Sequence, residues 1–350
     1  MNLEELTGRA YSCIPGCGFC CTFPAAVSTA ERRQLQAAGA GQAVAARNGV
    51  LSLKLQGGCG ACTLLNKDRQ CSVYDARPNP CRYFPFHVYF GRRTEVYVNY
   101  TCRGVILAPL GNLHAAYADS VTANVDAREL AAREAEARET HRQFQQLCRE
   151  AGIWEDPDPV VDALLMQGPD LFTAKGVTAL ARIAKDDAPL EEHLQAALEA
   201  WAARNPTHRP YYLDPATRWL TYAPEGDGLR VQELHDDGRL TSLHLIEGLT
   251  RWEEPPVLVQ EALFRYLERL ARRDLFVGSA FALVDEDGYR ARLREALASR
   301  LAEIVVDLVV RSRLIAPTLA RELSAEEVAD EVARFYDGDF LDSPTIGGFL

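Results

Sequence analysis

Long apolar runs are missing from this 350-residue sequence: none approaches the roughly 18 consecutive apolar residues that a membrane-spanning helix needs. Residues 1–9 also lack the basic region and the apolar core of a secretory signal peptide. We therefore expect a cytoplasmic protein with no membrane partner. No internal repeat and no P-loop, G-x-G-x-x-G or G-x-S-x-G motif is present, so none of these signatures supplies a catalytic site.

Positive charge is scarce over most of the chain. The formal net charge is −11, and the residues after 102 hold 27 Lys and Arg against 43 Asp and Glu. Because nucleic-acid affinity depends on neutralising phosphates with Lys and Arg, we expect no nucleic-acid partner. Residues 1–102 differ, with 11 Lys and Arg against 6 Asp and Glu, and this basic excess would offset the charge of metal-bound thiolates.

Cysteine is almost absent from the last 248 residues, which contain only Cys148, yet nine of the ten cysteines lie in the first 102. A disulfide framework requires an oxidising compartment and usually an even number of thiols, and the sequence indicates neither. Thiolates on short loops that contain Gly and Pro suit zinc or iron–sulfur clusters instead. The predicted metal ligands are Cys13, Cys17, Cys20, Cys21, Cys59, Cys62, Cys71, Cys81 and Cys102.

Most of these cysteines fall into short motifs. A C-x3-C-x2-C-C block begins at Cys13, and a C-x2-C knuckle in a glycine-rich loop begins at Cys59. Two prolines between Cys71 and Cys81 rule out a continuous helix there. Residues 86–102 then alternate as a hairpin around 91–93, which would bring the last of the nine cysteines near the others.

This pattern resembles the YkgJ-type cysteine-cluster family, described as a zinc- or iron-chelating domain. The resemblance covers roughly residues 10–105 and rests on the C-x3-C-x2-C-C block and on the run that includes Cys71, Tyr74, Arg77-Pro78, Cys81-Arg82 and Pro85-Phe86. More distantly, the chain is similar to flagellin lysine N-methylases, which also place a long helical region after the cluster. That resemblance implies a [4Fe-4S] centre used for methyl transfer to a protein lysine, and it assigns no catalytic role to any residue of the helical region.

A separate pattern points to S-adenosylmethionine. Cys13, Cys17 and Cys20, with the aromatic Phe19, match the C-x3-C-x-φ-C signature of radical S-adenosylmethionine enzymes. Three thiolates would leave one iron of a [4Fe-4S] cluster open to that cosubstrate. The repeating βα units in which the signature normally occurs do not follow, and six more cysteines could supply a fourth ligand. We therefore expect a closed ligand shell for at least one centre.

Zinc is the alternative metal, and it would simply stabilise the domain. One four-thiolate site would come from Cys59, Cys62, Cys71 and Cys81, and a second from the N-terminal cysteine block. Aromatic neighbours that would shield a cluster favour iron–sulfur over zinc. They are Tyr11, Phe19, Phe23, Tyr74, Tyr83, Phe84 and Phe86. Arg77 and Arg82 are candidate cofactor-binding residues, because a guanidinium can donate to cluster sulfur or to a carboxylate. The sequence thus predicts an iron–sulfur protein whose activity would be that of a methyltransferase or a redox enzyme. The alternative is a structural zinc protein.

Helical patterns dominate from residue 113 onward. We predict helices over 113–151, 159–167, 170–185, 189–204, 256–273 and 289–314, and a last helix from the capping box at Ser324. Apolar residues at helical spacing in 289–314 predict a core or oligomer face. They are Leu293, Leu297, Leu301, Ile304 and Leu308. A shorter helix, from the capping box at Ser28 to about residue 49, separates the two cysteine groups.

Strand-like segments at 218–222, 229–234 and 240–246 predict a small antiparallel meander within 211–247, with a turn at Asp237-Gly238. His235 and His244 near that turn are expected to be solvated rather than catalytic. The predicted fold class is α+β, mostly α. It comprises an irregular cysteine domain over 1–110 and a helical domain over 111–350, and we expect the helical domain to bind any protein substrate or partner.

Overall fold

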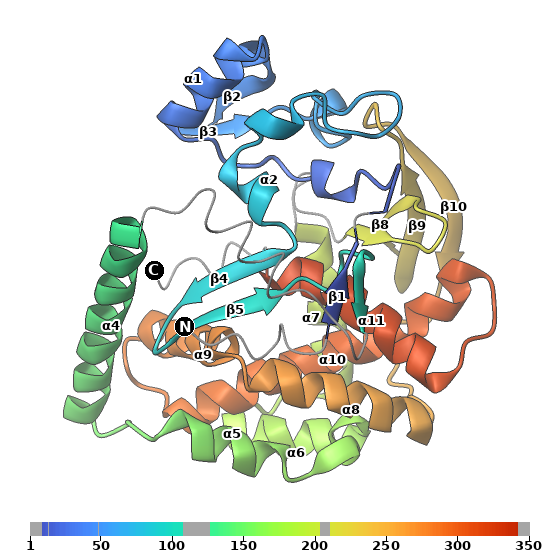
Figure 1. Ribbon diagram of the computed structural model, residues 1–350. Coiled ribbons are helices and arrows are strands. Elements are labelled where there is room, and N and C mark those ends of the chain that lie inside the picture. Colours follow the sequence, from blue (N-terminus) through green and yellow to red (C-terminus); the bar gives the residue numbers. More distant parts are fainter. Residues whose placement is uncertain (1–8, 13, 48, 108–126, 204–210, 342–350) are drawn as a thin grey trace.

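The computed structural model describes residues 9–12, 14–47, 49–107, 127–203 and 211–341 (Figure 1). Helices predominate, and the strands form small antiparallel sheets, so the predicted α+β, mostly α class is confirmed. Within these residues, no helix is both long enough and apolar enough to cross a membrane.

A body of helices forms the left-hand, lower and right-hand parts of the view in Figure 1. Its helices are α4 (Ala127–Glu150), α5 (Pro157–Leu165), α6 (Ala174–Ala184), α7 (Leu190–Ala203), α8 (Val257–Ala271), α9 (Asp274–Glu286), α10 (Leu293–Leu319) and α11 (Ala325–Leu341), with the 3-10 segment η6 (Gly168–Phe172). The long helix α10 packs against α5, α6, α7, α9 and α11. Its predicted leucine stripe is buried, so that stripe forms core.

Each helix predicted after residue 150 falls on an observed helix, but α9 was not predicted. Only two residues separate this helix from the end of α8, and it is buried around most of its circumference. It therefore lacks the one-sided apolar period by which sequence reasoning finds helices. Residues 113–126 of the first predicted helix lie outside the described residues, and α4 confirms its remainder.

The N-terminal part is built from short elements: β1 (Arg9–Tyr11), η2 (Phe19–Cys21), α1 (Thr29–Ala37), η3 (Gly41–Ala43), β2 (Val44–Arg47), β3 (Val50–Leu53), η4 (Gln56–Gly58), η5 (Tyr74–Ala76), α2 (Asn79–Tyr83), β4 (Phe86–Phe90), β5 (Thr94–Val98) and β6 (Val105–Leu107). Pairing is antiparallel for β1 with β6, β2 with β3, and β4 with β5. The β4–β5 pair confirms the predicted hairpin, although its second strand ends at Val98.

The predicted helix from Ser28 to about residue 49 was wrong in its second half. Ser28 and Glu31 do form the capping box of α1, but the helix ends at Ala37. Gly39 then takes a φ of +74°, and residues 44–53 form the β2–β3 hairpin. The helix is also more than a spacer, because the Glu31 carboxylate accepts the backbone N–H of Asn79 at 2.6 Å and so joins α1 to α2.

A four-stranded sheet of order β10-β9-β8-β7 confirms the predicted meander and adds one strand to it. The strands are β7 (Tyr211–Leu213), β8 (Trp219–Glu225), β9 (Gly228–Leu234) and β10 (Leu240–Ile246). The β9–β10 turn lies at Asp237-Gly238 as predicted, with Gly238 at a φ of +86°. This turn is not free in solvent, since its backbone packs against Gly57 and Gly60 of the cysteine-rich part.

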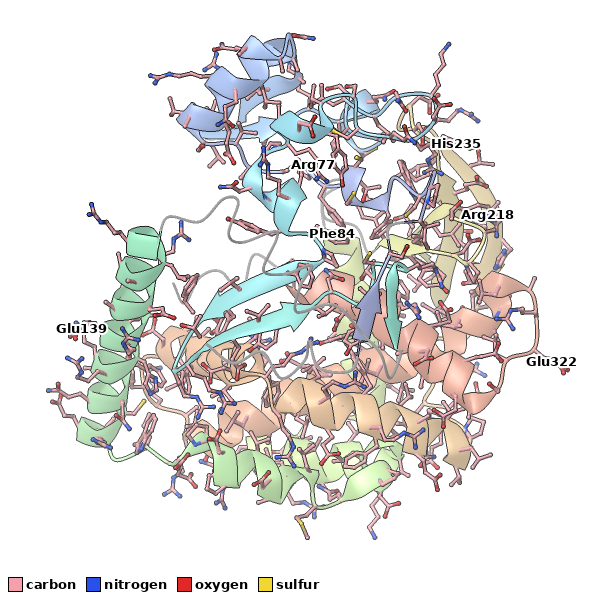
Figure 2. All side chains as sticks on the ribbon, viewed as in Figure 1. Arg77, Phe84, Glu139, Arg218, His235 and Glu322 are labelled. Carbon is pink, nitrogen blue, oxygen red and sulfur yellow. The ribbon has the colours of Figure 1, made fainter. Side chains whose placement is uncertain are left out.

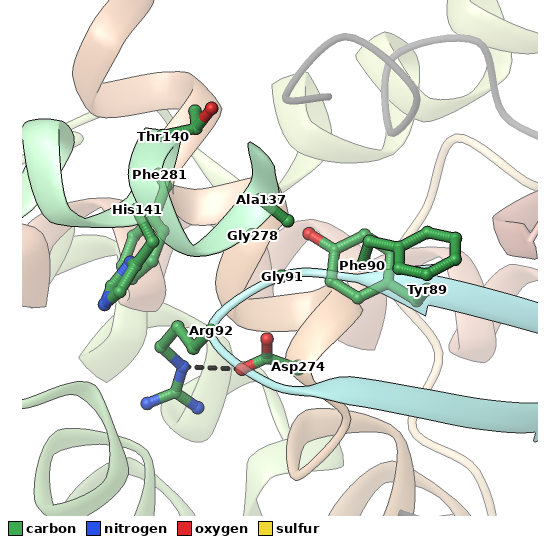
Figure 3. A pocket seen from close by; sticks show the side chains of 10 residues that line it. All are labelled: Tyr89, Phe90, Gly91, Arg92, Ala137, Thr140, His141, Asp274, Gly278 and Phe281. Carbon is green, nitrogen blue, oxygen red and sulfur yellow. Dashed lines mark hydrogen bonds and ion pairs between the residues drawn. The ribbon is translucent and has the colours of Figure 1, made fainter. Parts of the chain in front are cut away.

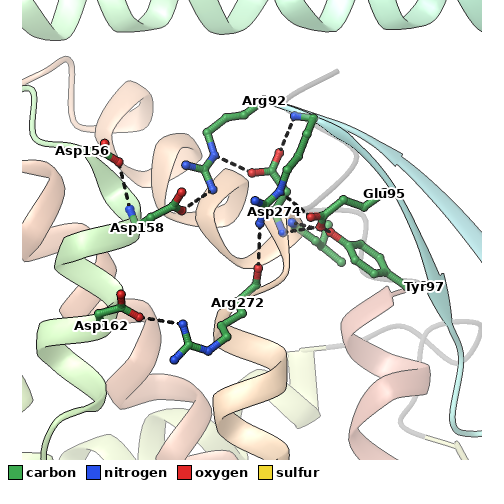
Figure 4. A network of polar contacts seen from close by, with 10 residues as sticks. Arg92, Glu95, Tyr97, Asp156, Asp158, Asp162, Arg272 and Asp274 are labelled. Carbon is green, nitrogen blue, oxygen red and sulfur yellow. Dashed lines mark hydrogen bonds and ion pairs between the residues drawn. The ribbon is translucent and has the colours of Figure 1, made fainter. Parts of the chain in front are cut away.

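The β4–β5 hairpin joins the cysteine-rich part to the helical body (Figure 4). The Glu95 carboxylate accepts the backbone N–H of Asp274 at 2.7 Å, and the Tyr97 hydroxyl accepts that of Leu275 at 3.1 Å. Strand β5 thereby satisfies N–H groups in the first turn of α9, which have no partner within the helix. Arg92 at the hairpin tip pairs with Asp274 at 2.5 Å. The boundary at residue 110 remains a prediction.

Candidate metal centre

Five cysteines from three stretches of the N-terminal part come together. Cys20 and Cys21 lie on η2, Cys62 and Cys71 on loops, and Cys81 on α2. The backbone N–H of Cys62 donates to the carbonyl of Cys21 at 2.7 Å, which fixes two of these stretches side by side. We refer to these residues as the five-thiol group.

The thiols of this group shift one another's pKa. A hydrogen bond from Cys21 lowers the pKa of Cys20 to about 7, whereas the same bond together with burial raises the pKa of Cys21. Burial, followed by the charges of Cys20, Cys62 and Cys71, raises the pKa of Cys81 to about 12. Several thiolates here would repel one another, and a bound cation would remove that repulsion. The donor set therefore fits a thiophilic metal.

Backbone N–H groups are directed at two of the sulfurs. Burial raises the pKa of Cys62 and of Cys71, and hydrogen bonds from the N–H groups of Leu64 and Val73 partly offset that rise. In each case the donor lies two residues after the cysteine. Hydrogen bonds of this kind stabilise a thiolate and tune the potential of an iron–sulfur cluster.

Arg77 directly follows η5 (Figure 2), and its charge helps to lower the pKa of Cys20 after the larger effect of the hydrogen bond from Cys21. Its guanidinium carbon stacks 3.4 Å from the centre of the Tyr74 ring, and its Nε donates to the Tyr74 carbonyl at 2.8 Å. Arg82 instead donates to the carbonyls of Arg77 at 2.7 Å and Asp75 at 2.6 Å. Arg82 thus holds the loop between Cys71 and Cys81, while Arg77 supplies positive charge near the sulfurs.

The wall around Cys62 is aliphatic. It is formed by Val27, Leu35, Ala40, Ala43, Leu53 and Leu64, and Cys21 and Cys81 pack against it. The aromatic residues Phe19, Phe23 and Phe84 belong to a different cluster, which surrounds Cys17 and Cys59. Tyr74, also expected to shield a cluster, is 60% exposed. The shielding near the five-thiol group therefore comes mainly from aliphatic side chains.

The other predicted ligands that the structure describes lie outside the five-thiol group. The structure separates Cys59 from Cys62, Cys71 and Cys81, its partners in the predicted zinc set, and its thiol donates to the carbonyl of Gly238 at 3.6 Å. Cys102 lies in the turn after β5. Cys13 is outside the described residues, and Cys148 is buried in the helical body.

Two histidines on the strands and turns near the cysteine-rich part have polar contacts of their own. His87 on β4 contacts the Asn99 amide at 3.2 Å, and His235 contacts the Thr241 hydroxyl at 2.8 Å. Among the described residues, no three Cys, His, Asp or Glu side chains already converge as the ligands of one ion would.

A pocket lies at the far end of the β4–β5 hairpin from α2 (Figure 3). Strand β4, α4 and α9 line it, and its polar side chains include Arg92, His141 and Asp274. Burial, followed by the charge of Arg92, lowers the pKa of His141. The five residues of β4 span roughly 16 Å, so this pocket is well separated from the five-thiol group.

Two residues near the cysteines escaped the sequence analysis. Arg69 and Trp219 come from opposite halves of the chain, and the guanidinium carbon of Arg69 lies 4.0 Å from the centre of the Trp219 ring. No local motif marks either residue, because their contact depends on how the β8–β10 sheet packs on the cysteine loops.

Comparison with known proteins gives one match. Neither the curated proteins nor the solved structures yield a significant relative of the chain. Residues 12–103 match the family model CxxCxxCC, described as "Putative zinc- or iron-chelating domain". The match spans every predicted ligand and the whole five-thiol group. The N-terminal part of this chain is therefore similar to the zinc- or iron-chelating domains of the cysteine-cluster family.

Proposed function

We propose that the protein is an iron–sulfur protein and that four thiolates of the five-thiol group ligate its cluster. The observation that carries this proposal is the gathering of five thiols whose pKa values respond to one another. Five thiols can fill all four ligand positions of a cubane cluster, which favours a closed shell. When bound, such a cluster supplies one-electron chemistry.

The chain's own residues have defined tasks in this proposal. The N–H groups of Leu64 and Val73 stabilise the charge on Cys62 and Cys71, and Arg77 adds a positive charge beside them. The aliphatic wall buries Cys62, whereas the other four cysteines of the group are half-buried. Since hydrogen bonds and burial both set cluster potentials, these groups would tune the potential of the centre.

Zinc is the second candidate, because four of the same thiolates would satisfy a tetrahedral structural site. The two metals differ in colour. An iron–sulfur protein purified without oxygen is brown from thiolate-to-iron charge transfer, whereas a zinc protein is colourless.

Paired variants test whether the five-thiol group holds the metal. Cys62 and Cys148 are both buried, at 4% and 0% exposed, but only Cys62 belongs to the group. We expect Cys62→Ala to lose the brown colour and the iron, and Cys148→Ala to retain both. Equal iron loss in the two variants, or stoichiometric zinc in the unaltered protein after iron-replete anaerobic expression, would contradict the proposal.

Methyl transfer from S-adenosylmethionine would require an open iron. With a closed shell, adding S-adenosylmethionine should leave the electron paramagnetic resonance spectrum of the reduced protein unchanged. A changed spectrum would instead support the methyltransferase form of the proposal, because the amine and carboxylate of the cosubstrate would then be iron ligands.

A further inference from the structure

The two edges of the four-stranded sheet differ in how they are covered. Strand β7 forms one edge, and its three residues are all buried and pack against α11. Strand β10 forms the other edge and has seven residues, of which Thr241, Ser242 and Leu243 are exposed. In Figure 1, β10 lies on the right-hand, outer side of the sheet. The long edge of the sheet is therefore the accessible one.

The backbone of β10 offers hydrogen-bonding groups along this edge. The N–H of His235 donates to the carbonyl of Arg239 at 2.9 Å and closes the β9–β10 turn. From there, hydrogen-bonded and non-hydrogen-bonded pairs alternate along the antiparallel ladder. The backbone groups of Leu240, Ser242 and, past the bulge, Leu245 therefore point away from their partners on β9. No described residue outside the sheet forms a backbone hydrogen bond with these groups.

The sequence of β10 lacks the residues that usually protect an edge strand. Leu240–Ile246 contains no proline, lysine or other charged side chain, although 25% of the whole chain is charged. Leu243, at the bulge, is a large apolar residue that is 38% exposed. A bulge disturbs pairing only locally, and the outward-facing residues lie on both sides of it. The edge is therefore suited to pairing with another strand.

Opposite charges at the two ends of β10 indicate which strand would pair with it. Arg239 precedes the strand, Glu247 follows it, and both are exposed. If two copies of β10 pair in antiparallel orientation, the Arg239 end of each copy meets the Glu247 end of the other. Opposite charges then lie together at both ends, which favours this pairing. The present contact of Arg239 with Asp237, at 3.8 Å between two side chains that are each 64% exposed, competes only weakly.

We propose that β10 pairs antiparallel with β10 of a second copy of this chain, across a two-fold axis. Ser242 of each copy then lies opposite Leu245 of the other, because both residues direct their backbone groups outward. The two exposed Leu243 side chains come close to the axis and lose contact with water. Two four-stranded sheets thereby become one continuous sheet. This inference does not depend on which metal the five-thiol group holds.

Sedimentation velocity of the full-length protein over a wide range of concentration tests the dimer. A single strand pair is a small interface, so we expect a reversible shift from monomer to dimer as the concentration rises. Leu243→Lys should abolish the shift, because it places a charge at the centre of the paired edge. Leu147→Lys is the matched control, since Leu147 is similarly exposed, at 44%, but lies on α4, and this variant should still dimerise. A protein that is monomeric at every concentration, or equal behaviour of the two variants, would overturn the proposal.

Exchanging the flanking charges tests the orientation of the two strands. Arg239→Glu and Glu247→Arg each place like charges together at both ends of the pair. Each should weaken the dimer by about tenfold at low ionic strength. The double variant Arg239→Glu/Glu247→Arg restores opposite charges and should recover the original dissociation constant. A dimer that neither single variant weakens, or a double variant weaker than both single variants, would overturn the antiparallel arrangement.

Discussion

Asp337 should be one of the most sensitive residues in the protein. It lies on α11, is 0% exposed, and pairs with the buried Arg273 at 3.0 Å. Its carboxylate also accepts the Tyr266 hydroxyl at 2.7 Å and the backbone N–H of Tyr100 at 3.0 Å. Asp337→Asn keeps the shape but leaves a buried guanidinium without its counter-charge. Breaking a buried pair in this way costs about 3–5 kcal/mol, so we expect that loss of unfolding free energy.

The neighbouring Arg272 supplies a matched control (Figure 4). It pairs with Asp162 at 2.7 Å, a shorter distance than in the buried pair, but the two side chains are 53% and 59% exposed. Asp162→Asn should cost no more than about 1 kcal/mol, because water screens exposed pairs. Urea unfolding followed by both tryptophan fluorescence and circular dichroism measures the difference. Equal losses in the two variants would refute the argument that burial determines the cost.

Three further predictions concern stability. Burial lowers the pKa of His87 to about 4, so its ring gains a proton more readily when the chain is unfolded. The stability due to the neutral ring is full above the unfolded pKa of about 6.5 and is lost as the pH falls toward 4. Between about pH 7.5 and pH 5 the protein should lose about 2 kcal/mol of unfolding free energy from this group. His87→Gln should reduce the pH dependence of stability by that amount, and an unchanged pH dependence would contradict the prediction. Glu31→Gln should lower the unfolding free energy measured in urea by about 1 kcal/mol. The reason is that the carboxylate accepts hydrogen bonds from the backbone N–H groups of both Ser28 and Asn79. An unchanged unfolding free energy would show that these contacts do not stabilise the fold. Gly278→Ala should destabilise the protein by about 1–3 kcal/mol although alanine favours helices. The added Cβ would lie 1.9 Å from the Tyr89 hydroxyl oxygen. Adding Tyr89→Phe should restore part of the lost stability, and no recovery would show that this clash is not the cause.

Local signals predicted where elements begin better than where they end. The capping box at Ser28 marked the start of α1, but its end was missed because the Ala-rich residues after it pair as the β2–β3 hairpin. The choice of strand over helix for Val44–Arg47 depends on pairing with Val50–Leu53, which propensity does not report. Conversely, Asp237-Gly238 predicted its turn correctly, since turn chemistry is local.

The sequence predicted nine cysteines as metal ligands, but it could not predict how the structure groups them. Their spacing placed Cys59 with Cys62 in one knuckle, whereas in the structure the two cysteines pack in different hydrophobic clusters. The cause is a turn at Asp236–Gly238, almost 180 residues away along the chain. Sequence analysis missed Trp219 and Arg69 for the same reason. Their contacts join the sheet to the cysteine loops, which are far apart along the chain.

Iron and acid-labile sulfide, measured on unaltered protein purified without oxygen and compared with Cys81→Ala, test the central claim most directly. Cys81 lies within the five-thiol group, and burial together with the neighbouring thiolates raises its pKa. The account predicts a brown protein with about four irons and four sulfides per cubane cluster, and loss of both from the variant. A colourless protein that contains zinc and no sulfide, or a Cys81→Ala variant with undiminished iron and sulfide, would contradict it.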